Sequence, residues 1–445
     1  MPIDRRSLVR LLPAPVAASL AAMFPPGASE SIARAQAADT PVAVATPVGG
    51  QPSTATTAVW TQIAADGGLV ARAVCHGDCP AAAVDGAAVA MSVRAGPGGA
   101  FTDTVCELPI PPEAASVTVD GVTLRTLPKA VVKIAVVGDT GCRIKGDDAQ
   151  ACNDPYVWPL ARIAAKIADW KPELVVHVGD YLYRESPCPP GNAGCFGSPS
   201  GDTAETWRAD VFEPLALLLP AAPWLFVRGN HEDCDRAGNG WFRHFDPRPM
   251  PAACQRFTPP YAVSIGGLRA VVMDTAEAGD VKTTPELNAE YARQLDEVDR
   301  LAEPGTWLFT HKQIAGSVLD LGQGEQIATT KTIVEATGNV LPADLDVIVA
   351  GHVHLSQAIF PLDRAVAPVG IVAGNGGTKE DVGVPGVYDG RVLGSPETST
   401  AIVDDEFGWM SVELDNGQAV CTSRALGDGT MFTLRLPNTL TAPPA

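Results

Sequence analysis

The chain has 445 residues, of which 46% are hydrophobic, so it can form roughly two or three domains with buried cores, and global disorder is excluded. Asp and Glu number 51 against 32 Lys and Arg, which gives a formal net charge of −19. This balance argues against nucleic acid as the main partner, because the chain has no excess of cations to neutralise a phosphate backbone. Small phosphorylated molecules stay possible, since a bound metal ion can meet their charge locally.

The N-terminal stretch has the pattern of an export signal. Arg5 and Arg6 precede a mostly apolar, alanine-rich run from Leu11 to Phe24, and Ala35-Gln36-Ala37 is typical of a signal-peptidase site. Paired arginines before a modest apolar run indicate a bacterial twin-arginine signal over residues 1–37. The mature protein is therefore expected in the periplasm or outside the cell. Because no other segment has about 18 uninterrupted apolar residues, we expect no stable membrane insertion after the signal is removed.

The ten cysteines also fit an oxidising compartment. Their spacing predicts three local disulfides, Cys142–Cys152, Cys188–Cys195 and Cys234–Cys254. The pairing of the other four stays open, because spacing alone does not determine connectivity. These four are Cys75, Cys79, Cys106 and Cys421. A cysteine zinc site is disfavoured, since the chain contains no C-x-x-C pair.

After the signal, the composition changes twice along the chain. Residues 38–56 are rich in Ala, Thr, Pro and Gly and predict a linker. Residues 57–128 contain short alternating apolar runs separated by Gly, Pro and Asp turns, which predict a small all-β domain. These runs are Leu69–Cys75, Ala88–Arg94 and Ala115–Val119.

Residues 129–445 are expected to form a larger, catalytic domain of the α/β class, because apolar strands alternate with helical stretches. The predicted strands are Val132–Val137, Leu174–Val178, Trp224–Val227, Ala270–Met273, Trp307–Thr310 and Val347–Ala350. The predicted helices are Val157–Trp170, Glu205–Leu219 and Pro285–Leu301.

Five polar clusters follow predicted strands of this larger domain. In chain order they are Gly138-Asp139-Thr140-Gly141, Gly179-Asp180-Tyr181-Leu182-Tyr183, Gly229-Asn230-His231-Glu232, Thr310-His311 and Gly351-His352-Val353-His354. The carboxyl ends of the strands form the ligand-binding edge of an open α/β sheet, so we expect these side chains to meet there. Four of the seven histidines of the chain lie in these clusters.

The donor types in the clusters indicate a metal site. Carboxylates, imidazoles, one amide oxygen and one phenol suit Fe, Mn or Zn better than Ca. Two cations about 3.5–4 Å apart can hold the attacking and leaving oxygens of a phosphoryl displacement. A shared carboxylate such as Asp180 reduces their repulsion, and a bridging water becomes hydroxide well below its normal pKa. The pattern predicts hydrolysis of phosphate esters by metal-bound hydroxide.

Together, the five clusters resemble the motifs of the purple acid phosphatases, within the calcineurin-like metallophosphoesterases. The resemblance covers about residues 131–377, and a small β domain before the catalytic one also fits it. Tyr183 is the discriminating residue, and Asp139-Thr140-Gly141 supports it, because most calcineurin-like relatives have Asp-x-His in the first motif. The resemblance implies a metallophosphoesterase β-sandwich flanked by helices and preceded by a small all-β domain.

The resemblance also implies a role for each matching residue. One ion, ferric in that family, would be held by Asp139, Asp180, Tyr183 and His354. The second ion, which would be Fe, Zn or Mn, would be held by Asp180, Asn230, His311 and His352. His231 would stabilise the phosphoryl group or protonate the leaving oxygen.

Some residues near the motifs have two interpretations. The family tends to place further histidines after its fourth motif to contact substrate, whereas this chain has none there, and Lys312 or Gln313 are the candidates in their place. Arg143 and Arg184 follow two metal motifs and either reach phosphate or form surface ion pairs. His177 lies inside an apolar strand and is expected to be a packed core residue.

The leading hypothesis is an exported phosphatase that acts on phosphate monoesters, with a small-molecule phosphate ester as its partner. A phosphodiesterase with the same two metals is the alternative, since the two differ only in the shape of the pocket. A secreted, non-catalytic binding protein on this scaffold is a third hypothesis. It is disfavoured because decay of the activity would remove metal ligands first, and all seven positions are present.

Overall fold

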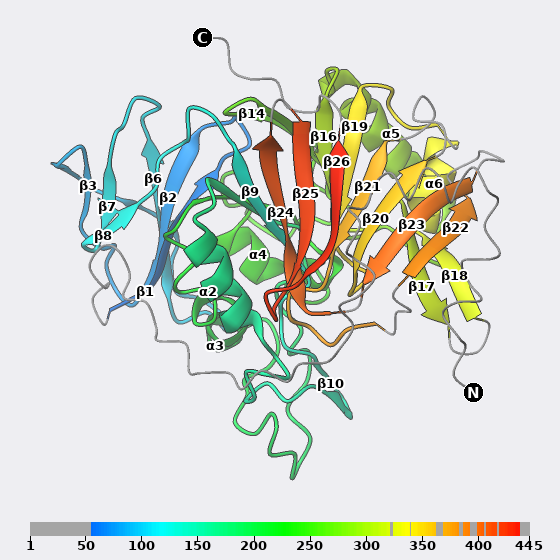
Figure 1. The fold of residues 1–445 in the computed structure, drawn as a ribbon. Helices are drawn as coiled ribbons and strands as arrows, with labels where there is room; N and C mark the ends of the chain where they lie inside the picture. Colours follow the sequence, from blue (N-terminus) through cyan, green and yellow to red (C-terminus); the bar gives the residue numbers. More distant parts are fainter. Residues whose placement is uncertain are drawn as a thin grey trace. The chain divides into compact units, whose positions relative to one another are not determined.

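The structure is a computed structural model that describes residues 55–320, 324–338, 340–361, 368–381, 386–391, 398–404, 406–415 and 418–436 (Figure 1). The predicted signal peptide, residues 1–37, lies outside the described residues, as does nearly all of the predicted linker, residues 38–56. Within the described part, no helix is long and apolar enough to cross a membrane.

The first large sheet has ten strands, and its central strands β9, β12 and β13 run parallel. In order across the sheet the strands are β26 (Thr430–Leu436), β25 (Gln418–Ala425), β24 (Gly408–Asp415), β9 (Lys133–Val137), β12 (Leu174–His177), β13 (Pro223–Phe226), β1 (Thr56–Ile63), β2 (Leu69–Cys75), β6 (Thr104–Ile110) and β5 (Ser92–Ala95). Two parts of the chain that are remote in sequence thus extend the central strands on either side.

The second large sheet has eight strands, of which β15, β16, β19 and β21 run parallel. In order they are β14 (Tyr261–Ile265), β15 (Leu268–Val272), β16 (Thr306–Phe309), β19 (Leu345–Ala350), β21 (Val369–Ala373), β20 (Ser356–Pro361), β23 (Thr398–Asp404) and β22 (Gly386–Arg391). Three small sheets complete the described strands. They are β10 (Ile144–Lys145) with β11 (Asp148–Ala149), β17 (Ala315–Asp320) with β18 (Gly324–Thr329), and β4 (Ala87–Val89), β3 (Ala82–Val84), β7 (Val117–Val119) and β8 (Val122–Leu124).

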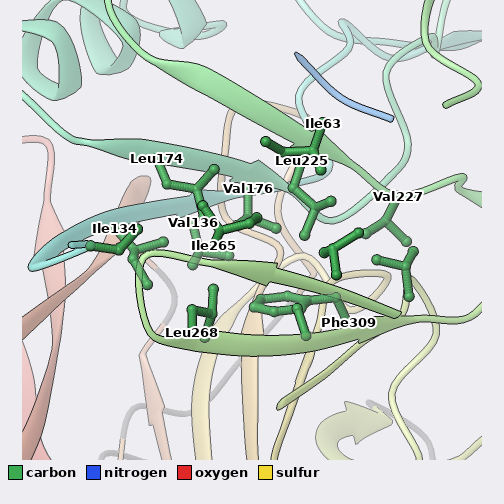
Figure 2. Packing of buried hydrophobic residues seen from close by; sticks show 14 of the residues in the cluster. Ile63, Ile134, Val136, Leu174, Val176, Leu225, Val227, Ile265, Leu268 and Phe309 are labelled. Atoms are coloured by element: carbon green, nitrogen blue, oxygen red, sulfur yellow. The ribbon is translucent and has the colours of Figure 1, made fainter. Parts of the chain in front are cut away.

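The two large sheets pack face to face, and the main hydrophobic core lies between them (Figure 2). Leu174 and Val176 of β12 point into this core, where Leu268 and Phe309 of the second sheet meet them. Val175 lies on the other face of β12, in a separate cluster with residues of the helices. Because both faces of the central strands are covered, these strands are continuous apolar runs without polar alternation.

Helices cover the outer faces of both sheets (Figure 1). Those that pack on the first sheet are α2 (Leu160–Trp170), α3 (Ala204–Trp207) and α4 (Gly238–His244). Those on the second sheet are α5 (Pro285–Leu301) and α6 (Lys331–Thr337). The Thr284 hydroxyl caps α5 by accepting from the Leu287 amide, and Pro285 suits the first turn.

The expected α/β sandwich flanked by helices is confirmed, and most predicted elements lie within a few residues of their expected bounds. The predicted helix Glu205–Leu219 is wrong in its length. Only Ala204–Trp207 is α-helical, followed by a wider turn over Arg208–Phe212 and further turns. Pro214 gives the physical reason, because it has no amide hydrogen and its ring clashes with the preceding turn.

The N-terminal strands form two structures. Four of them, β1, β2, β6 and β5, continue the first large sheet, with β1 parallel to β13 through the pair Thr61 and Pro223. The other four form the separate sheet β4-β3-β7-β8. The division of the chain into domains at residue 128 stays a prediction.

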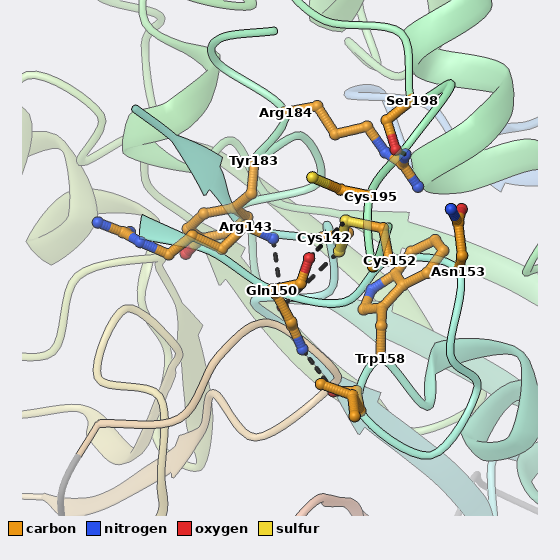
Figure 3. Close-up of a disulfide and its surroundings, with 12 residues drawn as sticks. Cys142, Arg143, Gln150, Cys152, Asn153, Trp158, Tyr183, Arg184, Cys195 and Ser198 are labelled. Atoms are coloured by element: carbon orange, nitrogen blue, oxygen red, sulfur yellow. Dashed lines mark hydrogen bonds between the residues drawn. A yellow bond between two sulfur atoms is a disulfide. The ribbon is translucent and has the colours of Figure 1, made fainter. Parts of the chain in front are cut away.

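All three predicted disulfides are confirmed, and a fourth joins Cys79 to Cys106. Cys75 and Cys421 are buried free thiols. Figure 3 shows the surroundings of the Cys142–Cys152 bond, where the Gln150 amide donates to the carbonyl of Gly377 at 2.9 Å. The disulfide-linked loop after β9 is therefore fixed to the segment that follows β21.

Candidate metal centre

The five polar clusters lie at the carboxyl ends of β9, β12, β13, β16 and β19. Three of their residues, Asp139, Asp180 and His352, have positive φ angles of 56°, 59° and 73°. Such angles are uncommon for residues other than glycine and concentrate at functional sites. At each of these three positions the chain leaves the strand and turns its side chain towards the same edge of the sandwich.

Asp180 lies at the centre of the cluster and is buried. Its Oδ2 atom is 2.7 Å from the Tyr183 hydroxyl and 3.2 Å from His311 Nε2. Its Oδ1 atom accepts the backbone amide of His231 at 2.9 Å. One carboxylate thus contacts groups from three strand ends, as a ligand shared between two ions requires.

Tyr183 joins the first group of predicted ligands. Its hydroxyl lies 3.1 Å from Asp139 Oδ1 and 2.8 Å from His354 Nε2. His354 Nε2 lies in turn 3.7 Å from Asp139 Oδ1. Tyr183 therefore contacts each of the other three side chains expected around this ion.

The second group of predicted ligands also meets Asp180, through His311. The His311 Nε2 atom lies 2.9 Å from Asn230 Oδ1. Donor atoms of Asp180, His311 and His352 all lie within 4.8 Å of one another. All seven predicted ligands are thus brought together by the fold.

Backbone carbonyls orient two of the three predicted histidine ligands. His311 Nδ1 lies 2.8 Å from the Val178 carbonyl, and His354 Nδ1 lies 2.8 Å from the Lys379 carbonyl. A carbonyl can only accept, so in both rings Nδ1 carries the proton and the Nε2 lone pair faces the cluster. This tautomer is the one that a metal ligand needs.

Two buried carboxylates outside the predicted set hold the motif backbones. Glu232 accepts the amides of Gly229, Asp180, Tyr181 and Leu182 at 2.8–3.2 Å. Asp210 accepts the amides of Cys142 and Tyr183 and the guanidinium of Arg184. Glu232 belongs to the third polar cluster and could be noticed in the sequence. Asp210 lies in the wide turn over Arg208–Phe212, and no sequence pattern marks it as a residue of the site.

The electrostatics of the cluster fit a cation. Burial and the neighbouring Asp180 carboxylate raise the pKa of Asp139 well above its usual value. Burial and the carboxylates of Asp180 and Asp139 likewise raise the pKa of the Tyr183 phenol. A cation among these oxygens would oppose both effects, because it favours the charged forms. The donor set, and the difficulty of ionising Asp139 and Tyr183 there without a cation, therefore fit the predicted metal ions.

Glycine is needed next to two of the ligands. A Cβ atom on Gly229 would overlap the backbone and carboxylate of Asp180, and one on Gly351 would overlap the Asp139 carboxylate. The close approach of these backbones leaves no room for a side chain.

His231 lies beside the cluster, with its ring 3.9 Å from that of Tyr183. Its Nδ1 atom is 2.8 Å from Glu185 Oε1, and its Nε2 atom is 3.8 Å from Asp180 Oδ2. The Nδ1 and Oε1 atoms are not aligned as a regular hydrogen bond, and no other hydrogen-bond partner of either occurs among the described residues. Glu185, which the sequence analysis missed, thus faces the predicted catalytic histidine.

The structure separates the alternatives for the neighbouring residues. Arg184 is buried and pairs with Asp210, so it does not form a surface pair. The Lys312 ammonium is also buried and contacts Asp280 and the Ala278 carbonyl, which leaves it poorly placed to meet a substrate. His177 is a packed core residue, as expected, and lies 3.0 Å from the Thr140 hydroxyl.

The sequence over residues 132–356, just over half of the chain, matches the calcineurin-like phosphoesterase family, and the chain belongs to this family. Its fold is similar to that of a purple acid phosphatase, PPD1 from yellow lupin (Lupinus luteus) seeds, with a TM-score of 0.52 and 15% identity over 85% of this chain and 73% of that one. It is also similar to the structure of PhoD, with a TM-score of 0.52 and 14% identity over 86% and 89% of the two chains. A comparison with curated protein sequences gives no significant match.

Because Asp180 contacts both groups of predicted ligands, Asp180→Ala is expected to remove both metal ions and abolish phosphoesterase activity. Elemental analysis of the purified variant measures this directly. Asp148→Ala is the control. The Asp148 side chain is 40% exposed and forms ion pairs with Arg143 and Lys379, and it is not a predicted ligand. Retention of both ions by the Asp180 variant would contradict the central place of this carboxylate.

Proposed function

We propose that the protein is an exported phosphatase that hydrolyses phosphate monoesters at a site with two metal ions. The observation that carries this proposal is the convergence of six donor side chains, from five strand ends, around a seventh, the Asp180 carboxylate. Membership of the calcineurin-like phosphoesterase family supports hydrolysis of phosphate esters as the reaction class.

The contacts support the division of ligands that the resemblance to purple acid phosphatases implies. We propose that one ion is held by Asp139, Asp180, Tyr183 and His354, whose polar atoms lie 2.7–3.7 Å from one another along the chain of contacts. We propose that the other is held by Asp180, Asn230, His311 and His352. When bound, the two ions supply positive charge for the phosphate oxygens and lower the pKa of an attacking water.

His231 is proposed as the catalytic residue that acts on the substrate. It does not belong to either ligand group, yet its Nε2 atom lies within 3.8 Å of the shared carboxylate. From this place the imidazole can donate a proton to the leaving oxygen of the ester. Glu185 faces the other ring nitrogen and can hold the ring in the orientation that directs Nε2 towards the substrate.

The donor set leads us to propose iron with iron, zinc or manganese. Carboxylates, imidazoles and a phenolate suit ferric iron at the first site, and the second set, with two imidazoles and an amide oxygen, suits a divalent ion. The four disulfides among the described residues support an exported protein, because such bonds persist in oxidising compartments.

A panel of aryl phosphate monoesters and diesters tests the proposal. The protein should hydrolyse the monoesters faster, and a chelator should abolish this activity until metal is restored. A clear preference for diesters would assign the same metal site to a phosphodiesterase. Chelator-resistant hydrolysis, or no hydrolysis by fully metal-loaded protein, would contradict the proposed function.

For His231→Ala we expect turnover to fall by roughly 10²–10⁴, with metal content unchanged, because the side chain acts on the substrate side of the site. The loss should shrink for esters with good leaving groups, which need less protonation. His76→Ala is the matched control, since His76 is an exposed histidine outside the site. An equal loss for every leaving group would indicate that His231 positions the substrate and does not protonate it.

The colour of the iron-loaded protein tests the identity of the metal. A phenolate bound to ferric iron gives a charge-transfer band in the visible region, so the protein should be violet to pink and Tyr183→Phe should bleach it. The variant should keep much of its activity, because the phenol does not attack phosphorus. A colourless, iron-free and active enzyme would instead point to zinc or manganese at both positions.

A further inference from the structure

His352 differs from the other two predicted histidine ligands in the group that orients it. His311 and His354 each direct Nδ1 at a backbone carbonyl. The His352 ring instead contacts a side chain, because its Nε2 atom lies 3.2 Å from Oδ2 of Asp280. This aspartate comes from the loop after β15 and belongs to none of the five motifs.

The chemistry of imidazole determines what this contact does. A neutral ring has one N–H and one lone pair, and an ionised carboxylate can only accept a hydrogen bond. The carboxylate, 3.2 Å away, therefore favours the tautomer with the proton of His352 on Nε2 and the lone pair on Nδ1. His352 thus presents the opposite nitrogen to that of His311 and His354.

Asp280 contacts the His352 ring and is not one of the clustered donor groups. The donor atoms of Asp180, His311 and His352 that lie within 4.8 Å of one another form a group without the Asp280 carboxylate. This carboxylate contacts His352 Nε2 and the Lys312 ammonium, which suits a partner of the ligand.

The loop that carries Asp280 is fixed at its backbone by the start of α6. The Lys331 amide donates to the Asp280 carbonyl at 3.2 Å, and the Thr332 amide donates to the Gly279 carbonyl at 3.0 Å. The Thr332 hydroxyl also accepts the Gly279 amide at 2.8 Å. The position of the carboxylate is thus set by a helix end.

Lys312 fixes the carboxylate itself. Its buried ammonium lies 2.9 Å and 3.1 Å from the two carboxylate oxygens and 2.6 Å from the Ala278 carbonyl. Lys312 directly follows His311, so the same strand end supplies one predicted ligand and the cation that holds the partner of another. The lysine also neutralises the added negative charge beside the site.

We propose that Asp280, held by Lys312, is a positioning residue that orients His352 so that Nδ1 binds the second metal ion. This inference rests on the proposed two-metal function and extends it to a residue outside the motifs. Loss of the partner of a ligating histidine typically weakens metal binding by roughly 10- to 100-fold.

Chelator competition on the metal-loaded protein tests the proposal through metal affinity. Asp280→Ala should weaken the binding of one of the two ions by roughly 10- to 100-fold and leave the other unchanged. Asp280→Asn should stay within about threefold of the wild type, because its amide oxygen can still accept from Nε2. Wild-type affinity for both ions in the alanine variant, or equal losses in the two variants, would overturn the proposal.

Glu277→Ala is the matched control, since Glu277 lies in the same loop and pairs with Arg256. It should bind both ions like the wild type. Failure of the wild type itself to bind two ions would reject the two-metal function. Normal binding by the wild type together with an unaffected alanine variant would reject the role of Asp280 alone.

Histidine tautomers in the zinc-loaded wild type give a second measurement that depends on no variant. With nitrogen-15 labelled histidine, the proton of His352 should be found on Nε2, and those of His311 and His354 on Nδ1. A proton on Nδ1 of His352 would overturn the proposal.

Discussion

The buried carboxylate of Asp180 is the constraint on which the rest of the centre depends. A buried anion is costly unless other groups compensate it, and here phenol, imidazole and backbone amide groups from three strand ends surround it. These contacts require β12, β13 and β16 to end at one edge of the sandwich. The fold meets that requirement by stacking two sheets whose parallel strands all end there. The fold and the site therefore depend on the same condition, namely that these strands end at one edge of the sandwich.

A second layer of buried acids fixes the backbones that present the ligands. Glu232 accepts four amides, and Asp210 joins the loops after β9 and β12. Burial, followed by repulsion from Asp180, raises the pKa of Glu232 to about 8. The hydrogen bonds that Glu232 accepts from the backbone amides of Tyr181 and Leu182 oppose this rise in its pKa. At neutral pH Glu232 is therefore largely protonated, and Asp210 pairs with Arg184, so this outer layer holds the backbones without adding much negative charge to the centre.

The local parts of this structure could be predicted from the sequence, and the long-range parts could not. Each motif lies directly after an apolar strand, so the ligands and most central strands could be predicted from neighbouring residues. The three predicted disulfides span only 7 to 20 residues. Asp280 and Glu185 meet their histidines only through tertiary packing, and a lone acid in a loop has no distinctive pattern. The Cys79–Cys106 bond could not be predicted either, because Cys75 lies close to the same partner.

The neighbours of β9 have a consequence for how the protein is made. On one side β9 pairs with β12, a short distance along the chain, but on the other side it pairs with β24. Met410, the partner of Val136, comes 274 residues later. While the chain leaves the ribosome, this edge of β9 has to wait until that distant segment has been synthesised. Pairing across such a distance is slow, and an open edge invites association with other chains. A nascent chain that ended after residue 377 would contain every proposed ligand and still lack the strand that closes the sheet beside Asp139.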